Sequence, residues 1–171
     1  NKIYADFFDE LVELFPSCND YLNISKYKHL RDKLENPLDE EHILKQKQLY
    51  RKYIKIINSI NNTNCSRAEL VYNQVLKHQC SNSIRFYRYN FDLMPINHQD
   101  NIIIHILEMA KGDTIFSFTK KEDYYTFLRK INVFPRIIDS IIVKFREGIN
   151  IKYTLPKIIA TELETQFKSI L

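Results

Sequence analysis

The sequence predicts an all-α protein, an irregular antiparallel array of about six to eight helices. Apolar residues recur at spacings of three and four through much of the 171 residues, which is the period of a helix with one buried face. Helix-capping patterns precede several of these runs. The chain has only two glycines and five prolines, whereas a β-sandwich needs a turn about every ten residues. Its length and 44% hydrophobic content fit one domain over residues 1–171.

Three helices are predicted in the first half of the chain. The first covers Ile3 to Phe15 and is closed by a proline. The second follows Asn36-Pro37, an expected cap with a first-turn proline, and runs to about Ile60. Ser66-Arg67-Ala68-Glu69 has the form of a capping box and opens the third, which is expected to reach about Tyr89.

The second half starts with an ambiguous segment. Ile102 to Met109 is expected to be a helix, although its three consecutive isoleucines would also suit a buried strand. Thr119-Lys120-Lys121-Glu122 resembles a capping box and predicts a helix from Lys120. The apolar face of that helix would carry Tyr124, Leu128 and Ile131.

Two further helices are predicted before the end. The first starts near Phe134-Pro135, because a proline is tolerated in a first turn, and Gly148 is expected as its left-handed C-terminal cap. Thr154-Leu155-Pro156 predicts the start of the last. The predicted core lies on the apolar stripes of these helices and comprises Phe7, Leu11, Leu128, Ile138, Ile141, Phe145, Ile159 and Leu163.

The last third of the chain also carries an ordered set of short motifs. They are Phe116-x-Phe118, Thr119, Asp123-Tyr124-Tyr125, Leu128-Arg129, Phe134-Pro135, Arg146-Glu147-Gly148-Ile149 and Thr154-Leu155-Pro156-Lys157. Upstream, Asp6 to Leu11, Phe15-Pro16 and Leu93 to Asn97 fit the same pattern. Together these residues resemble the N-terminal half of the domain of unknown function 885 family, most clearly from about Phe91 to Leu171. Lys152 departs from that pattern, because family members usually carry a second glycine there.

The resemblance implies a helical protein of a zinc metallopeptidase-like family. The family's metal site lies in its C-terminal half, on a helix with a His-Glu pair followed by another histidine, and this chain has no such arrangement. We therefore expect an N-terminal scaffold that supplies one wall of a substrate cleft. Its expected partners are the remaining C-terminal half of the same protein, which would hold the zinc, and a peptide substrate.

No catalytic, cofactor-binding or metal-binding residue is assigned in this chain, which alone is expected to bind no zinc and to lack peptidase activity. The chain stops at Leu171 inside an apolar pattern, so the protein is expected to continue. The alternative is a non-catalytic helical interaction or structural module, and a weaker alternative is an RNA-binding helical protein.

The five histidines are candidate metal ligands. His105 and Glu108 are three apart and would be neighbours on a helix, with His98 two turns upstream. Metal sites usually need three or four ligands and no second cluster appears, so a partly buried polar pair is favoured. The remaining histidines, His29, His42 and His78, are isolated.

Charged and aromatic residues give little further evidence of chemistry. Ile84-Arg85-Phe86-Tyr87-Arg88-Tyr89 could stack bases and pair phosphates, but the net charge is only +4 and acids lie among the bases, which disfavours nucleic acid. Two acidic clusters are explained by solvation and by helix dipoles without acid–base catalysis. These clusters are Asp9, Glu10 and Glu13, and Asp39, Glu40 and Glu41.

Cysteine usage favours a reducing compartment. Cys18, Cys65 and Cys80 are odd in number and widely spaced, so reduced thiols in a cytoplasmic or other intracellular setting are expected. Glycosylation patterns at Asn23 and Asn64 recur by chance in an asparagine-rich chain. No apolar run approaches the roughly 20 residues that a membrane helix needs, so no membrane association is expected.

Overall fold

The computed structural model describes residues 2–99, 101–112 and 116–170. Within these residues it contains eight α-helices and four short 3-10 helices and no strand, which confirms the all-α prediction. Ile102 to Lys111 is one of the helices, so the ambiguity over its isoleucines is decided in favour of helix. No described helix is both long enough and apolar enough to cross a membrane.

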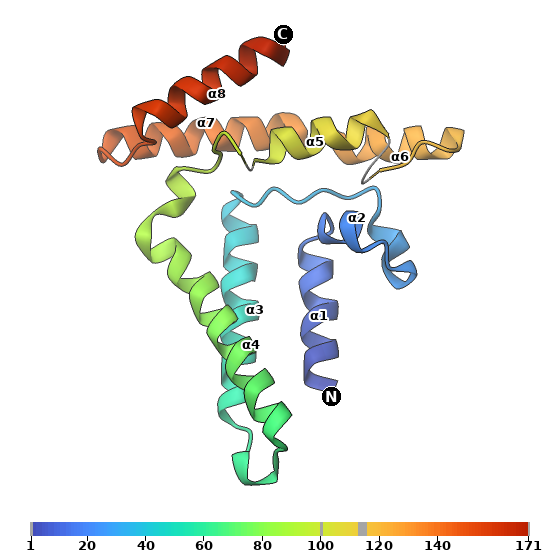
Figure 1. Cartoon of the computed structure of the whole chain (residues 1–171), viewed down its shortest axis with the longest axis vertical. Helices are drawn as coiled ribbons and strands as arrows, with labels where there is room; N and C mark the ends of the chain where they lie inside the picture. The colour runs from blue at the N-terminus through green and yellow to red at the C-terminus, as the bar shows by residue number, and fades with distance from the viewer. Residues whose placement is uncertain (1, 100, 113–115, 171) are drawn as a thin grey trace.

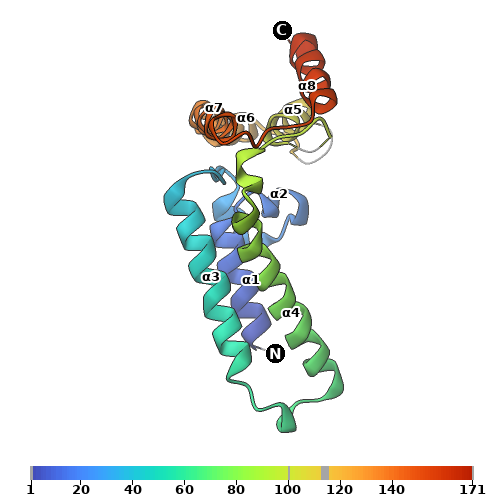
Figure 2. The same ribbon diagram turned by 90° about the vertical axis from the view of Figure 1, so that its left-hand side faces the viewer.

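The helices form two parts, one of which runs across the end of the other (Figures 1 and 2). Three lie along the long axis: α1 (Lys2–Leu14), α3 (Glu40–Asn58) and α4 (Arg67–Phe86). Three others run across one end of them: α5 (Ile102–Lys111), α6 (Lys121–Ile131) and α7 (Phe134–Asn150). The short helices α2 (Cys18–Leu22) and η1 (Ser25–Leu30) lie near this junction, and α8 (Lys157–Ile170) projects beyond the crossing layer.

Side-chain caps fix where several helices begin. Ser66 and Glu69 form the predicted capping box of α4, with the Ser66 N–H donating to Glu69 Oε2 over 2.9 Å. The start of α3 differs from the prediction, because Asp39 rather than Asn36 is its cap and accepts from the Glu41 N–H over 2.8 Å. α4 ends at Phe86, and Tyr87–Tyr89 continues as the 3-10 helix η3.

The cap of α6 lies one residue later than predicted. Asp123, not Glu122, accepts from the backbone N–H of Lys120 over 2.9 Å, and the Thr119 hydroxyl donates to the same carboxylate over 3.0 Å. The helix therefore starts at Lys121. The shift places the Asp123 side chain on the buried side of the first turn.

Gly148 is not the C-terminal cap that the sequence predicts. It lies inside α7, which runs on to Asn150, and the left-handed conformation falls on Lys152 with a φ of 61°. A Cβ atom on Gly148 would lie 2.5 Å from the Tyr153 carbonyl oxygen and 3.3 Å from that of Leu93. Glycine is therefore required here for close backbone approach, and the positive φ is adopted by the lysine, at a steric cost that glycine would not have.

The interior is divided into three hydrophobic clusters. The crossing layer contains the largest, with buried Leu34, Ile96, Ile106, Met109, Phe116, Ile137, Ile141 and Leu163. The three long helices enclose Leu49, Tyr50, Tyr53, Ile57, Leu76 and Cys80. A small cluster of Val12, Tyr27 and Leu30 joins α1 to η1. The segment between η1 and α3 contributes Leu34 to the first cluster and so ties the two parts together.

The predicted core is confirmed in most of its members. Ile141 and Leu163 are buried, and partly buried Phe7, Leu11, Ile138, Phe145 and Ile159 pack against the clusters. The prediction that Leu128 is buried is wrong, because 56% of its surface is exposed. Tyr124, on the same predicted stripe, is exposed as well. α6 instead turns Asp123, Phe127 and Lys130 inward. Asp123 pairs with Arg31, and Lys130 pairs with Asp20. These ion pairs decide which face of α6 is buried.

Candidate binding cleft

A cleft of about 1050 Å³ opens where the long helices meet the crossing layer. Its walls come from α1, from α3, from the segment after η1 and from the end of α6. Leu14, Leu34, Leu49 and Val133 give it an apolar part. The volume lies slightly above the roughly 300–1,000 Å³ that is usual for ligand sites.

The polar part of the cleft carries equal numbers of acidic and basic side chains. The acids are Asp9, Glu10, Glu13, Asp32 and Glu35, and the bases are Lys33, Lys45, Lys52, Arg129 and Lys130. Two of these acids pair with bases of the lining, Glu10 with Lys52 Nζ over 2.6 Å and Asp32 Oδ2 with Arg129 Nε over 3.1 Å. A balanced lining does not attract a polyanion, because a polyanion binds through an excess of positive charge.

Glu10 is the best-connected acid of the lining. Lys52 Nζ lies 2.6 Å and 2.7 Å from its two carboxylate oxygens, and the Tyr53 hydroxyl donates to it over 2.8 Å. Partial burial opposes ionisation of Glu10, but these hydrogen bonds outweigh it and the pKa of the carboxyl is lowered. Burial and the same carboxylate raise the pKa of Tyr53. α1 and α3 are thus tied together at the cleft wall.

His42, which lines the cleft, has one buried ring nitrogen without a hydrogen-bond partner among the described residues. Its ring packs edge-on against Phe15 at 5.2 Å between centroids, and none of the described residues hydrogen-bonds its buried Nε2 atom. Burial lowers the pKa of His42, although nearby Glu35 acts in the opposite direction. Glu35 itself accepts from the Ser17 N–H over 3.1 Å. An unpaired buried nitrogen costs free energy, so a ligand that pairs with it would gain affinity.

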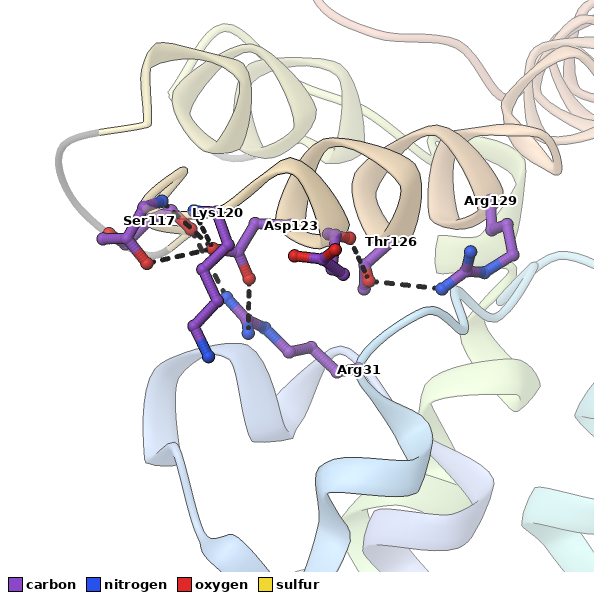
Figure 3. Close-up of polar contacts among 8 residues, drawn as sticks. Arg31, Ser117, Lys120, Asp123, Thr126 and Arg129 are labelled. Atoms are coloured by element: carbon purple, nitrogen blue, oxygen red, sulfur yellow. Dashed lines mark hydrogen bonds and ion pairs between the residues drawn. The ribbon is translucent and has the colours of Figure 1, made fainter.

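A polar junction joins the end of η1 to α6 (Figure 3). Arg31, directly after η1, donates to Asp123 Oδ1 over 3.1 Å and to the Ser117 carbonyl oxygen over 3.4 Å. Its guanidinium also lies 4.6 Å from the centroid of the Phe116 ring. The N–H of Lys120 lowers the pKa of the Asp123 carboxyl, helped by Thr119 and Arg31 and opposed by burial.

Asp123→Asn is expected to destabilise the chain at neutral pH and to have less effect in acid. The folded-state pKa of Asp123 lies below its unfolded value of 3.8. The stabilisation by this carboxylate is therefore complete above that value and is lost as the pH falls through the folded pKa. Urea unfolding of the unmodified chain and of the variant between about pH 7 and about pH 2 measures this difference in stability.

Asp139→Asn, at an exposed carboxylate of α7, is the control and should change stability little at any pH. A destabilisation by Asp123→Asn that stays constant over this range would contradict the prediction.

A buried ion pair lies behind the cleft. Lys130 Nζ approaches the two carboxylate oxygens of Asp20 at 3.0 Å and 2.9 Å and donates to the Lys33 carbonyl oxygen over 2.7 Å. The Lys130 side chain is 0% exposed and the Asp20 side chain 2% exposed. His105 lies next to this pair, with Nε2 3.9 Å from Asp20 Oδ2 and Nδ1 2.6 Å from the Tyr21 hydroxyl oxygen.

The histidines weighed in the sequence are distributed over the molecule. His29 pairs with Glu13 over 2.8 Å, and His78 with Asn82 over 2.7 Å. His98 accepts at its carbonyl oxygen from Gln166 over 2.6 Å. No group of three or more histidine, cysteine, aspartate or glutamate side chains in the described part of the chain is arranged to hold a metal ion.

The other candidates have local structural partners. Tyr87, at the end of the Arg-aromatic run, donates to Gln46 over 2.7 Å, while Arg85 and Arg88 are exposed. Lys26 pairs with Asp9 at 2.5 Å, in agreement with a structural explanation of the first acidic cluster. In the second cluster Asp39 is a helix cap and Glu40 and Glu41 lie in the first turn of α3. All three cysteines are free thiols.

Sequence reasoning missed the cleft and the buried ion pair. Asp20 and Lys130 are 110 residues apart, and Arg31 and Asp123 are 92 apart. Neither pair produces a local spacing that could be read from the chain. The one available signal was a pair of charges, Asp123 and Lys130, separated by two turns on a face of α6 next to its expected apolar stripe.

No protein-family model matches the chain, and no match was found among curated proteins or solved structures. The resemblance to the domain of unknown function 885 family therefore stays a prediction.

Proposed function

We propose that this chain is a helical binding module that holds a peptide in the cleft between α1, α3 and α6. The observation that carries the proposal is the cleft itself, which combines about 1050 Å³ of space with an apolar wall and a balanced set of charges. Every peptide residue offers a backbone donor and acceptor, so a peptide suits a lining that contains both charges. His42 lines the cleft as well, with its Nε2 atom buried and without a hydrogen-bond partner among the described residues.

The proposal keeps one part of what the family resemblance implies, the wall of a substrate cleft. It assigns no catalytic role to the lining residues and treats the bound peptide as a ligand. It also agrees with the alternative of a non-catalytic interaction module. Nucleic acid is a less suitable ligand, since the lining has no excess of cations.

A blocked cleft should lose its peptide ligands. Gln48 is exposed on α3 and lines the cleft, so Gln48→Trp places an indole in the opening without disturbing the core. Peptides selected from a random displayed library against the unmodified chain are expected to bind the variant at least about tenfold more weakly by calorimetry, which corresponds to about 1.4 kcal/mol.

The matched control is Gln79→Trp on the exposed surface of α4, outside the cleft. This variant adds the same side chain and should bind the selected peptides as the unmodified chain does. Equal affinity for Gln48→Trp would place the ligand elsewhere and contradict the proposal. Failure to select any peptide that binds better than its scrambled sequence would contradict peptide binding altogether.

A further inference from the structure

An exposed tyrosine lies at the outer end of the buried polar cluster. The Tyr21 hydroxyl oxygen is 2.6 Å from His105 Nδ1, and 63% of the Tyr21 residue is exposed. The two rings lie nearly parallel, 23° apart with centroids separated by 5.1 Å. Tyr21 is thus accessible to a reagent from solution while its hydroxyl contacts a mostly buried imidazole.

The local sequence explains how α2 exposes Tyr21 to solvent while Asp20 is buried. Asp20 and Tyr21 are consecutive, and successive side chains of a helix point about 100° apart, so one can face the interior while the other faces solvent. Asn19 fixes the short helix, because its Oδ1 accepts from the Ile24 N–H over 3.0 Å and its Nδ2 donates to the Tyr27 carbonyl oxygen over 3.3 Å.

The inner side of the imidazole faces a carboxylate. His105 Nε2 is buried, lies 3.9 Å from Asp20 Oδ2, and has no hydrogen-bond partner among the described residues. Lys130 holds the same carboxylate at 2.9 Å. A hydroxyl, an imidazole and a buried carboxylate in this order are the components of a nucleophile, its general base and a negative charge that stabilises the protonated base.

We propose that Tyr21, His105 and Asp20 form a nucleophilic site at which Tyr21 takes an acyl group from an activated ester. The Tyr21 oxygen attacks the ester carbonyl carbon while His105 Nδ1 takes the phenolic proton. A bond forms between that oxygen and the acyl carbon, the bond to the leaving oxygen breaks, and the proton passes from Nδ1 to the leaving oxygen. The other imidazole proton stays on Nε2, and the Asp20 carboxylate 3.9 Å away stabilises the imidazolium that forms. Lys130 is a positioning residue for Asp20. This site does not depend on a peptide in the cleft.

The test is the rate at which individual tyrosines are acetylated by p-nitrophenyl acetate, measured by peptide mass spectrometry. Tyr72 and Tyr125 serve as internal controls, because they are 58% and 50% exposed and neither hydrogen-bonds to a histidine within the part of the chain that the structure describes. Tyr21 is expected to react at least about tenfold faster than either, a conservative value for general-base assistance. Tyr21→Phe should remove the corresponding fast release of p-nitrophenolate.

Substitution of His105 shows whether fast acetylation of Tyr21 comes from general-base assistance or only from the exposure of Tyr21. In His105→Ala the rate at Tyr21 should fall to that of Tyr72, and added imidazole should restore it, while the Tyr72 rate stays unchanged. If His105→Ala loses its helical dichroism, His105→Gln keeps a polar side chain that cannot serve as the base and should give the same slow rate. Acetylation of Tyr21 no faster than of Tyr72 in the unmodified chain would overturn the proposal. A fast rate that persists in a folded His105 variant would overturn it as well.

Discussion

Lys130→Met is expected to lower the free energy of unfolding by about 3–5 kcal/mol, the range found when one partner of a buried ion pair is removed. Methionine fills much of the space of the lysine stem, so the main loss is electrostatic. Asp20, whose side chain is 2% exposed, would keep its charge without the ammonium at 2.9 Å. The Lys33 carbonyl oxygen would lose its donor as well. Urea unfolding followed by helical dichroism at neutral pH measures the change.

The double variant Asp20→Asn with Lys130→Met is the control. It removes both charges, and replacement of a whole buried pair by neutral groups is often close to neutral for stability. Most of the loss should therefore be recovered. A double variant as unstable as Lys130→Met would mean that packing or the Lys33 contact, rather than the uncompensated carboxylate, causes the effect. A single variant as stable as the unmodified chain would contradict the buried pair itself.

Ile141→Ala is expected to cost about 2–5 kcal/mol, the usual range for removing a large aliphatic side chain from a core. Ile141 is 4% exposed and belongs to the largest cluster, which joins α5, α6, α7 and α8 with Leu34. The loss consists of the transfer free energy of the removed methyl and methylene groups and of the cavity that the fixed neighbours leave. Urea unfolding of the two chains measures it.

The next residue of α7 is the matched control. Ile142 is 42% exposed, so Ile142→Ala removes the same atoms from the same helix at a position near solvent. It should cost less than about 1 kcal/mol, because little apolar surface leaves water there on folding. Equal costs for the two substitutions would contradict the burial of the Ile141 face of α7 in the core of the crossing layer.

α6 shows how far periodicity can predict a helix and where it stops. The capping residues and the spacing of three and four place the helix within one residue of its observed start. The same spacing fits two faces, one with Tyr124 and Leu128 and one with Asp123, Phe127 and Lys130. Apolar content favoured the first face. The second is buried because Arg31 and Asp20 pair with its charges.

Gly148 shows the same limit for a single residue. A glycine near the end of a predicted helix is typical of a left-handed cap. Here the helix continues past it. Glycine is needed because a Cβ atom would lie 2.5 Å from the Tyr153 carbonyl oxygen and 3.3 Å from that of Leu93. Such approaches depend on how the chain turns after the helix and on a segment far away in sequence, and the spacing of residues does not show them.

His105 shows the limit for a candidate site. Local spacing offered Glu108 as its neighbour, since only residues of one helix can be paired in that way. Its recorded partners are Asp20 and Tyr21, the latter 84 residues away. The cleft likewise combines α1, α3 and α6, which no local motif connects.

The sequence by itself determined the class of fold, the position of most helices and much of the core. These depend on interactions within a few residues: caps, turn-breaking prolines and the spacing of apolar side chains. The tertiary structure alone decided which face of α6 is buried, which charges are paired inside, and that a cleft and an exposed tyrosine backed by histidine exist. These depend on partners up to 110 residues apart, because a buried charge is stable only where the fold brings its counter-charge within about 4 Å.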